Sequence, residues 1–393
     1  MQSDVPFAIL GPFDHQPRTR LVFGAGKVDQ VGKLAAEFGP RRVLVVTDRG
    51  IASAGHAQRV EHSLQAAGLG TVIFDQVREN PTSRDVESCV EVARAAGVDL
   101  IVGLGGGSSM DTAKGCNFLL TNGGQMKDYW GVGKAKQPML PLIAIPTTAG
   151  TGSECQSAAL IADDETHQKM ACLDPKAAAR IALLDPQLTV SQPPRVTVST
   201  GIDAIAHAVE TAVTKRRNPI SAMYSHEAFK LTMSGFDRVV KDPLDVEARG
   251  QMLLGAAFAG LAIENSMLGA AHSAANPLTA HFNIVHGQAV GMMLPAVVRF
   301  NASDPAVRRA YAHLAGDMEL DGDGQLGARL DGLLNLAGFP RSLAECAVPR
   351  SAISMLADEA ARQWTAAFNP RKVAVQDFVR LYEAAFEPRS QAS

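Results

Sequence analysis

Three consecutive glycines follow an apolar run in the stretch Asp99-Leu-Ile-Val-Gly-Leu-Gly-Gly-Gly-Ser-Ser-Met-Asp-Thr-Ala-Lys114. The apolar run does not alternate with polar residues, which is typical of a strand buried on both faces of a parallel sheet. Glycines directly after such a strand lie where open parallel sheets bind their ligands, and the next helix turns its positive end toward an anion. The stretch therefore predicts a phosphate-binding loop in an α/β domain.

The spacing of these glycines does not match the G-x-G-x-x-G pattern of dinucleotide-binding folds. Counted from Gly103 and Gly105, the sixth position is Ser108, and the loop lies too far into the chain to follow the first strand. Two interpretations stay open at this point: a phosphate-binding loop of another kind, or a glycine turn with no ligand.

Similar apolar runs flank this stretch and alternate with helical segments. They occupy residues 41–48, 71–77, 140–148 and 179–185. Strands joined through helices of about a dozen residues predict a parallel sheet covered on both faces. Strand-like runs nearly vanish after residue 187, and segments rich in Ala, Leu, Met and Glu take over. We therefore predict an α/β domain over 1–187 followed by an all-α domain over 188–393, in keeping with the length of 393 residues.

Charge and hydropathy argue against two classes of partner. The net charge is -3, and the longest cationic cluster is the isolated triplet at 215–217, so neither nucleic acid nor an anionic membrane is an expected partner. The most membrane-like segment, 252–271, is interrupted by Glu264 and Asn265, which favours a buried core helix. The amino terminus lacks the features of a secretory signal, so we expect a cytoplasmic protein. The five scattered cysteines indicate reduced thiols rather than disulfides.

A second loop with ligand-binding character follows the apolar run at 140–148. Its sequence, Ile145-Pro-Thr-Thr-Ala-Gly-Thr-Gly-Ser-Glu154, is dense in hydroxyl groups. Two such loops on one sheet edge are able to hold a pyrophosphate and its riboses, although an ordinary polar connection explains this one equally well alone. Asp48, at the end of the run 41–48, is suited to accept a ribose 2′-hydroxyl and to repel a 2′-phosphate, which favours NAD over NADP. A helix N-cap is an equally good explanation of Asp48.

Candidate metal ligands occur in the helical half. Asp203 and His207 stand four residues apart in Gly201-Ile-Asp-Ala-Ile-Ala-His-Ala-Val-Glu210. Their side chains therefore project from the same face of a helix, with Cβ atoms about 5–6 Å apart. Many helices carry this spacing without an ion. His272 and His286 strengthen the interpretation as a metal site, because they are able to supply two more nitrogen ligands. One oxygen and three nitrogens suit iron(II) or zinc(II) and do not distinguish them.

The segments GGGSSMDTAK, PTTAGTGSE, GIDAIAHAVE and IVHG together resemble the iron-containing, or group III, alcohol dehydrogenase family. The resemblance extends over the whole chain, with FGAGKV at 23–28, Glu79-Asn-Pro-Thr82 and Asn369-Pro-Arg371 in matching places. It implies an amino-terminal NAD(P)-binding domain, a helical carboxyl-terminal domain and one divalent ion, iron(II) in preference to zinc(II). It also implies a homo-oligomer and a small alcohol or aldehyde as substrate.

The resemblance assigns residues to two sites. The implied metal ligands are Asp203, His207, His272 and His286. The implied NAD-lining residues are Asp48, Asn80, Gly105, Gly106, Gly107, Ser108, Asp111, Thr147, Thr148, Thr151 and Lys169. The loop around Asp48 fits the members that use NAD.

One position departs from the family pattern. The family commonly has a further histidine four residues after the first histidine of the stretch 272–287, near the substrate, and this chain has Asn276 there. Asparagine forms hydrogen bonds but does not titrate. His281 is a candidate to replace the missing imidazole as a proton carrier, and a packed or surface histidine is the alternative.

The function predicted from these residues is reversible hydride transfer between NAD(H) and an alcohol, with an ion that polarises the substrate oxygen. Two other enzymes on the same fold are alternatives: a hydroxyacid–oxoacid transhydrogenase and a maleylacetate reductase. A non-catalytic NAD-binding or metal-binding protein is an alternative of another class.

Overall fold

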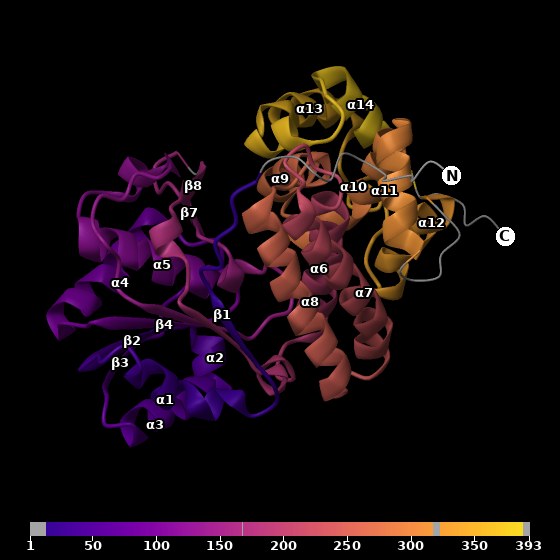
Figure 1. The fold of residues 1–393 in the computed structure, drawn as a ribbon. Helices are drawn as coiled ribbons and strands as arrows, with labels where there is room; N and C mark the ends of the chain where they lie inside the picture. Colours follow the sequence, from indigo (N-terminus) through magenta and orange to yellow (C-terminus); the bar gives the residue numbers. More distant parts are fainter. Residues whose placement is uncertain (1–12, 167, 317–322, 388–393) are drawn as a thin grey trace. The chain divides into compact units, whose positions relative to one another are not determined.

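The computed structural model describes residues 13–166, 168–316 and 323–387 (Figure 1). Two compact units make up the chain, one spanning Gln16–Gln192 and the other running from Pro193 onward and including His15. The predicted domain boundary at 187/188 falls in a short 3-10 helix, η5 (Pro186–Thr189), inside the first unit. That boundary stays a prediction.

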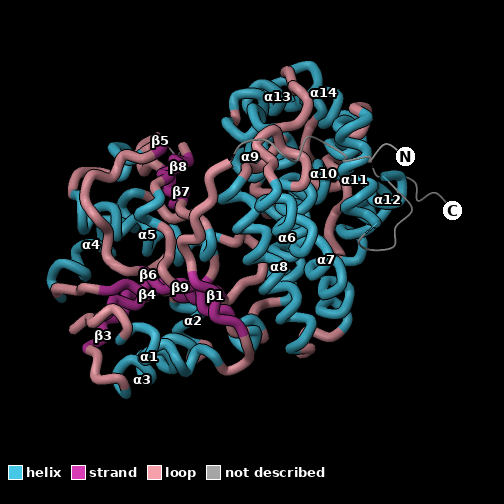
Figure 2. Tube along the Cα trace, in the orientation of Figure 1, coloured by secondary structure: helices cyan, strands magenta, loops and turns pink. Residues whose placement is uncertain are grey.

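A six-stranded, all-parallel sheet forms the centre of the first unit, in the order β1-β9-β6-β4-β2-β3 (Figure 2). All five predicted strands are present, whereas the edge strand β1 was not predicted because its four residues are too short a run to stand out. The strands are β1 (Arg20–Phe23), β2 (Arg42–Val46), β3 (Gly70–Phe74), β4 (Leu100–Gly105), β6 (Leu142–Pro146) and β9 (Ile181–Leu184).

Strand β2 marks the point where the strand order reverses. From β2 the chain first adds β3 on one side and then β4 on the other, so the connections after β2 and β4 leave the sheet toward opposite faces. Ligands of open parallel sheets bind outside the carboxyl ends of strands at such a reversal. Asp48 follows β2, and the three glycines end β4 and open the next helix.

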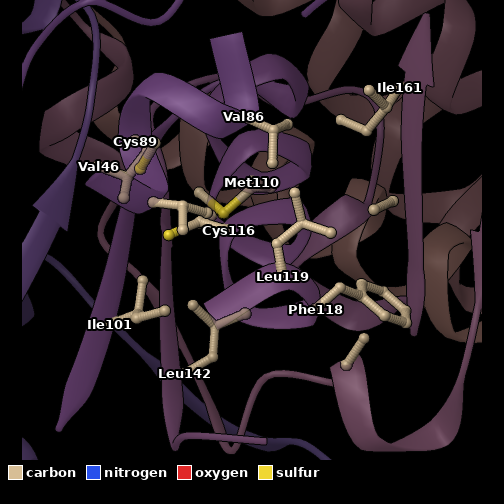
Figure 3. Close-up of a cluster of buried hydrophobic side chains, with 14 of the residues drawn as sticks. Val46, Val86, Cys89, Ile101, Met110, Cys116, Phe118, Leu119, Leu142 and Ile161 are labelled. Carbon is tan, nitrogen blue, oxygen red and sulfur yellow. The ribbon is translucent and has the colours of Figure 1, made fainter. Parts of the chain in front are cut away.

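Helices cover both faces of the sheet because neighbouring strand residues point in opposite directions. Leu44 and Val46 of β2 join the core on the α4 and α5 side, and Val43 and Val45 join the core on the α1 and α3 side. Figure 3 shows the first of these cores, with Met110 of α5 among its labelled residues. The helices of this unit are α1 (Val31–Ala36), α2 (Arg49–Ser53), α3 (His56–Ala66), α4 (Ser83–Ala96) and α5 (Gly107–Asn122).

A second, three-stranded sheet in this unit was not predicted from the sequence. Its order is β5 (Gly131–Val132), β8 (Lys169–Leu173) and β7 (Ala158–Ala162), with β7 and β8 antiparallel. The first strand has only two residues, and the apolar runs of the other two, AALIA at 158–162 and MACL at 170–173, are too short to stand out from the sequence around them. Short 3-10 helices complete the unit: η1 (Lys27–Gln30), η2 (Met126–Tyr129), η3 (Ser153–Cys155) and η4 (Pro175–Ala177).

The described part of the second unit consists of helices and contains no strand, as predicted. Its helices are α6 (Pro194–Thr211), α7 (Pro219–Lys241), α8 (Val246–Asn265), α9 (Ala270–Phe282), α10 (His286–Asn301), α11 (Pro305–Gly316), α12 (Asp323–Leu336), η6 (Arg350–Ala352), α13 (Ile353–Arg362), η7 (Trp364–Phe368) and α14 (Val375–Ala384).

The membrane-like segment 252–271 lies mainly in α8, where Leu253, Ala256 and Ala259 are fully buried. In the described ranges no single helix has both the length and the apolar character to cross a bilayer; only α8 and α9 taken as a pair, bent by 108°, pass on length and composition. The five cysteines are all free thiols, as expected from their scatter.

Candidate active site

Helix α6 presents three ionisable side chains on one buried face. Asp203, His207 and Glu210 follow one another at helical spacing, and each residue is at most 6% exposed. Burial of ionisable groups is costly unless they are paired or bind an ion. The D-x-x-x-H spacing therefore does place both predicted α6 ligands in a common interior site.

His272 and His286 reach the same carboxylate from two other helices. The Nε2 atoms of His272, His207 and His286 lie 3.2, 3.5 and 3.8 Å from Oδ1 of Asp203. His272 stands in the first turn of α9 and is buried, whereas His286 is the first residue of α10 and its side chain is 40% exposed. The structure thus brings together all four residues that the sequence suggested as metal ligands.

The glycine after His286 explains how α10 comes so close to α6. A Cβ atom on Gly287 would lie 2.0 Å from the carbonyl oxygen of Ser199, so any other residue would push the two helices apart. Because His286 is adjacent to Gly287, this close approach brings the backbone of His286 near α6, and its Nε2 lies 3.8 Å from Oδ1 of Asp203.

The electrostatics of this cluster favour a cation. Burial raises the pKa of the Asp203 carboxyl, but the three imidazoles outweigh it and hold that pKa well below its usual range. Burial lowers the pKa of His272, but Glu210 and Asp203 outweigh it and raise the pKa to about 10. Two buried carboxylates among three imidazoles therefore attract positive charge into one interior volume.

A divalent metal ion fits this donor set. Ligand atoms of Asp203, His207 and His272 lie within 4.8 Å of one another, and His286 supplies a further nitrogen beside them. Three imidazole nitrogens and one carboxylate oxygen suit a borderline ion such as iron(II) or zinc(II). The rings of His207 and His272 stack with centroids 4.8 Å apart, which directs both toward Asp203 from the same side.

The two candidate catalytic residues lie further along α9 and are both held by neighbours. The amide nitrogen of Asn276 donates a hydrogen bond to Oε1 of Gln363 at 3.1 Å. Nε2 of His281 lies 3.0 and 2.9 Å from the two carboxylate oxygens of Glu359, and this pair is exposed. The pairing with Glu359 gives His281 a structural partner, and its role as a proton carrier stays a prediction.

The predicted cofactor residues around the sheet reversal lie close together in the first unit. Asp48 is the N-cap of α2, where its Oδ1 accepts a hydrogen bond from the backbone of Ile51 at 2.9 Å. A Cβ atom placed on Gly105 would lie 3.6 Å from the other carboxylate oxygen of Asp48, so this oxygen borders the glycine loop. The N-cap interpretation of Asp48 is therefore correct, and a ribose contact through the second oxygen stays a prediction.

The two predicted loops pack against each other through glycine and threonine. A Cβ atom on Gly106 would lie 3.3 Å from Thr148, and one on Gly107 would lie 3.0 Å from Thr151. Gly106 is the N-cap residue of α5, and it contributes no side chain to the cap. The first-turn N–H groups of a helix have no partner inside that helix, so they are available to an anion.

The remaining predicted cofactor residues divide into exposed and interior positions. Lys169 and Asn80 approach each other, with Nζ 3.4 Å from Oδ1, and Asn80 adopts a left-handed backbone with φ 53°. Ser108 is half-buried, whereas Thr147 is buried and its backbone donates to the carbonyl of Gly105 at 2.9 Å. Asp111 accepts a hydrogen bond from the Ser153 hydroxyl at 3.2 Å.

A buried polar cluster lies behind these loops. The ammonium group of Lys114 donates to the carbonyl oxygens of Ser153 and Ala158 and to the Ser153 hydroxyl. Burial raises the pKa of the neighbouring Glu154 to about 7, against the lowering by a backbone N–H and by the charge of Lys114. Burial also raises the pKa of Asp111, against the charges of Lys114 and Lys169.

Models of known protein families match nearly all of the chain. The model described as iron-containing alcohol dehydrogenase matches residues 17–186, and the model of the carboxyl-terminal part of the Fe-containing alcohol dehydrogenase family matches residues 197–386. The chain belongs to the iron-containing alcohol dehydrogenase family.

Individual members of the iron-containing alcohol dehydrogenase family agree with this assignment. The NAD-dependent methanol dehydrogenase of Bacillus methanolicus is 34% identical in an alignment over 380 residues that covers 93% of this chain and 97% of that protein. A crystal structure of a 1,3-propanediol oxidoreductase is similar, with a TM-score of 0.92 and 29% identity over 96% of this chain and all of the other. The sulfoacetaldehyde reductase of Bifidobacterium kashiwanohense, solved with NAD+, has a TM-score of 0.88 and 27% identity, covering 95% of this chain and 99% of that one.

These matches confirm the predicted family, fold class and enzyme class. This member of the iron-containing alcohol dehydrogenase family is an NAD-dependent, metal-containing oxidoreductase. The non-catalytic alternative finds no support in them, because the relatives are named as dehydrogenases and reductases.

Three polar residues in or beside these sites were not predicted from the sequence: Glu210, Gln363 and Glu154. Glu210 carried a readable signal, since it shares the α6 face of Asp203 and His207 at positions i, i+4 and i+7. Gln363 had none, because it meets Asn276 from a segment 87 residues later in the chain. Glu154 follows the second loop directly, and its burial depends on the tertiary packing around Lys114.

Proposed function

We propose that this enzyme oxidises a small alcohol to the aldehyde or ketone with NAD as hydride acceptor, and catalyses the reverse reaction, using a divalent ion held by Asp203, His207, His272 and His286. The observation that carries the proposal is the convergence of three imidazole nitrogens on one buried carboxylate oxygen, at 3.2, 3.5 and 3.8 Å. An ion bound there supplies Lewis acidity that polarises the substrate oxygen and lowers the pKa of an alcohol.

We assign NAD to the edge of the parallel sheet at the strand reversal. The N–H groups of the first turn of α5 are available to an anion, and Gly106 and Gly107 place no side chain in the approach to them. The second carboxylate oxygen of Asp48 is the proposed acceptor for the ribose 2′-hydroxyl. The hydroxyl groups of Thr147, Thr148 and Thr151 and the polar groups of Asn80, Ser108, Asp111 and Lys169 complete the proposed lining.

We propose that Asn276 forms a hydrogen bond with the substrate and takes no part in proton transfer. Asn276 stands one turn beyond His272 on α9, and its amide nitrogen is already directed toward Gln363. Its carbonyl oxygen is left as an acceptor for a hydroxyl group of the substrate. Proton release then passes through water and hydroxyl groups, or through His281, rather than through residue 276.

Removal and return of the metal test the proposal. The enzyme stripped with a chelator should not reduce NAD with any alcohol in a panel of primary alcohols, diols and hydroxyacids, and iron(II) or zinc(II) should restore the activity. Full activity of the metal-free enzyme would refute it. His207→Ala should abolish the rescue, whereas the control His313→Ala changes an exposed histidine of α11 that is outside the proposed site.

A second acceptor in the same assay tests the transhydrogenase alternative. Turnover between a hydroxyacid and an oxoacid with no added NAD, by enzyme that retains its cofactor, would favour transhydrogenation. We expect turnover to require added NAD. We also propose that the enzyme is a homo-oligomer, which its mass in solution would test.

A further inference from the structure

Glu210 contacts His272 of α9 at the ring nitrogen that faces away from Asp203. Its Oε2 lies 2.5 Å from Nδ1 of His272, and Nε2 of the same ring lies 3.2 Å from Oδ1 of Asp203. The two nitrogens of one imidazole thus face two different carboxylates, both of them buried. An acceptor at Nδ1 keeps the proton on that nitrogen and leaves the lone pair on Nε2, which is the atom that faces the proposed ion.

The other oxygen of Glu210 holds the carboxylate in place. Oε1 accepts a hydrogen bond from the backbone N–H of Ala271 at 2.7 Å, while Oδ1 of Asn369 accepts the neighbouring N–H of Ala270 at 3.3 Å. These donors belong to the first turn of α9, whose N-cap residue is Gly269 and has no side chain to offer. Glu210 therefore caps α9 from another helix, and its negative charge lies at the positive end of the α9 dipole.

Capping alone does not require a carboxylate. Asn369 satisfies the adjacent N–H of the same turn with a neutral amide oxygen, so a glutamine at position 210 offers an equivalent acceptor to Ala271. The contact with Nδ1 of His272 is different, because a glutamine that accepts from Ala271 would turn an NH2 donor toward Nδ1. A carboxylate has a second oxygen that accepts the Nδ1 proton, and its charge increases the basicity of Nε2. The helix end thus accepts a carboxylate or an amide, whereas the contact with His272 calls for the carboxylate.

We infer that Glu210 is a positioning residue of the metal centre: it orients the His272 ring, fixes its tautomer and strengthens Nε2 as a ligand. This inference rests on the proposed ligand set and assigns a role to a residue outside it. Helix α6 then supplies two of the proposed ligands, Asp203 and His207, and also Glu210, which supports a third ligand. The three residues occupy positions i, i+4 and i+7 of one helix face.

The experiment measures cobalt(II) binding to the full-length metal-free protein, by competition with a chromophoric chelator and by the visible absorption spectrum of the bound ion. Glu210→Gln should weaken cobalt(II) binding by about 10- to 100-fold and shift the visible bands. Glu227→Gln, the same change at an exposed residue of α7, should alter neither. Wild-type affinity and spectrum in Glu210→Gln would overturn the inference.

A double-variant cycle separates positioning from a structural role. If Glu210 acts through His272, Glu210→Gln should weaken binding in the wild-type background and have no further effect in His272→Ala. An equal loss in both backgrounds would mean that Glu210 only stabilises the fold, and the inference would fail. Should Glu210→Gln not fold, Glu210→Asp keeps the charge, and its affinity should lie between those of wild type and His272→Ala; wild-type affinity there would contradict the inference.

The same measurements distinguish the proposed metal site from the role of Glu210. Unchanged cobalt(II) binding in Asp203→Ala and His272→Ala would refute the proposed metal site itself. Weaker but measurable binding in those variants, together with unchanged binding in Glu210→Gln, would refute only the role of Glu210.

Discussion

The amide nitrogen of Asn276 donates a hydrogen bond to Oε1 of Gln363, 3.1 Å away, and so ties α9 to the end of α13. Asn276 stands one turn after His272 on α9, at the position where the family pattern has a histidine. An amide in this place orients a partner through hydrogen bonds and has no proton to give up near neutral pH.

Asn276→His should therefore add a titratable group to the reaction. We expect the pH profile of kcat for alcohol oxidation to gain an inflection at about pH 6.5, with the higher rate on the alkaline side where the imidazole is neutral and accepts a proton. Steady-state kinetics between pH 5 and 9 measure this. Asn276→Gln is the control, since it changes size without adding a titratable group. Identical profiles for the two variants would show that residue 276 does not take part in proton transfer.

Gly107→Ala should weaken NAD binding. The added Cβ would lie 3.0 Å from Thr151, at the first turn of α5 where the N–H groups are assigned to the cofactor phosphates. We expect KM for NAD to rise by roughly tenfold, about 1.4 kcal/mol in binding, with a smaller change in KM for the alcohol. Gly332→Ala in α12 is the control, because nothing lies within 4 Å of its added Cβ.

The double variant Gly107→Ala/Thr151→Ser shows which contact matters. Serine removes the Cγ2 methyl that lies nearest to the new Cβ, so recovery of KM would mean that the two loops had been pushed apart. If KM does not recover, the Cβ methyl group added at position 107 itself blocks the cofactor. A wild-type KM for NAD in Gly107→Ala would contradict the assignment of this loop.

Substitutions of Asp48 should separate its two roles. Asp48→Asn keeps an N-cap acceptor for Ile51 but removes the charge, whereas Asp48→Ala removes both. Both variants should relax the preference for NAD over NADP, measured as the ratio of kcat/KM values. Only Asp48→Ala should also lose about 1 kcal/mol of stability, seen as a lower melting temperature. An unchanged cofactor ratio in both variants would leave Asp48 as a helix cap alone.

Glu154 should make stability fall as the pH rises from about 4.5 toward 7. Burial raises the pKa of this carboxyl in the folded protein to about 7 from an ordinary 4.5. A raised folded-state pKa gives a contribution that is fully present below the unfolded pKa and lost as the pH rises through the folded pKa. The loss amounts to about 3 kcal/mol from the size of that shift.

Glu154→Gln removes the titration, so the variant should gain melting temperature relative to wild type between pH 5 and 8. Thermal melts at constant ionic strength measure the difference. Glu165→Gln, at an exposed position of the same unit, should show no such trend. If the difference in melting temperature between Glu154→Gln and wild type stays constant across this pH range, the pKa of Glu154 is not raised in the folded protein.

Local patterns predicted much of the parallel sheet and the general location of both sites. All five predicted apolar runs contain strands: 41–48, 71–77, 99–107, 140–148 and 179–185. Strands of a parallel sheet covered on both faces have few polar residues, so they are visible in the sequence as continuous apolar runs. The small sheet β5-β8-β7 was not predicted because its strands are short, with two, five and five residues.

Local sequence patterns were sufficient for the features that depend on neighbouring residues along the chain. Helical spacing places Asp203, His207 and Glu210 on one face of α6, and the glycines after β4 open the first turn of α5. Contacts between residues far apart in the chain followed from the fold alone: His272 with Asp203 and Glu210, Asn276 with Gln363, and Asp48 with Gly105. The physical reason is that backbone periodicity sets the direction of a side chain on its own element, whereas its partner depends on how closely two elements pack. The close approach of Gly287 to Ser199 is an example, because it brings the start of α10 near α6, where the ring of His286 lies beside Asp203.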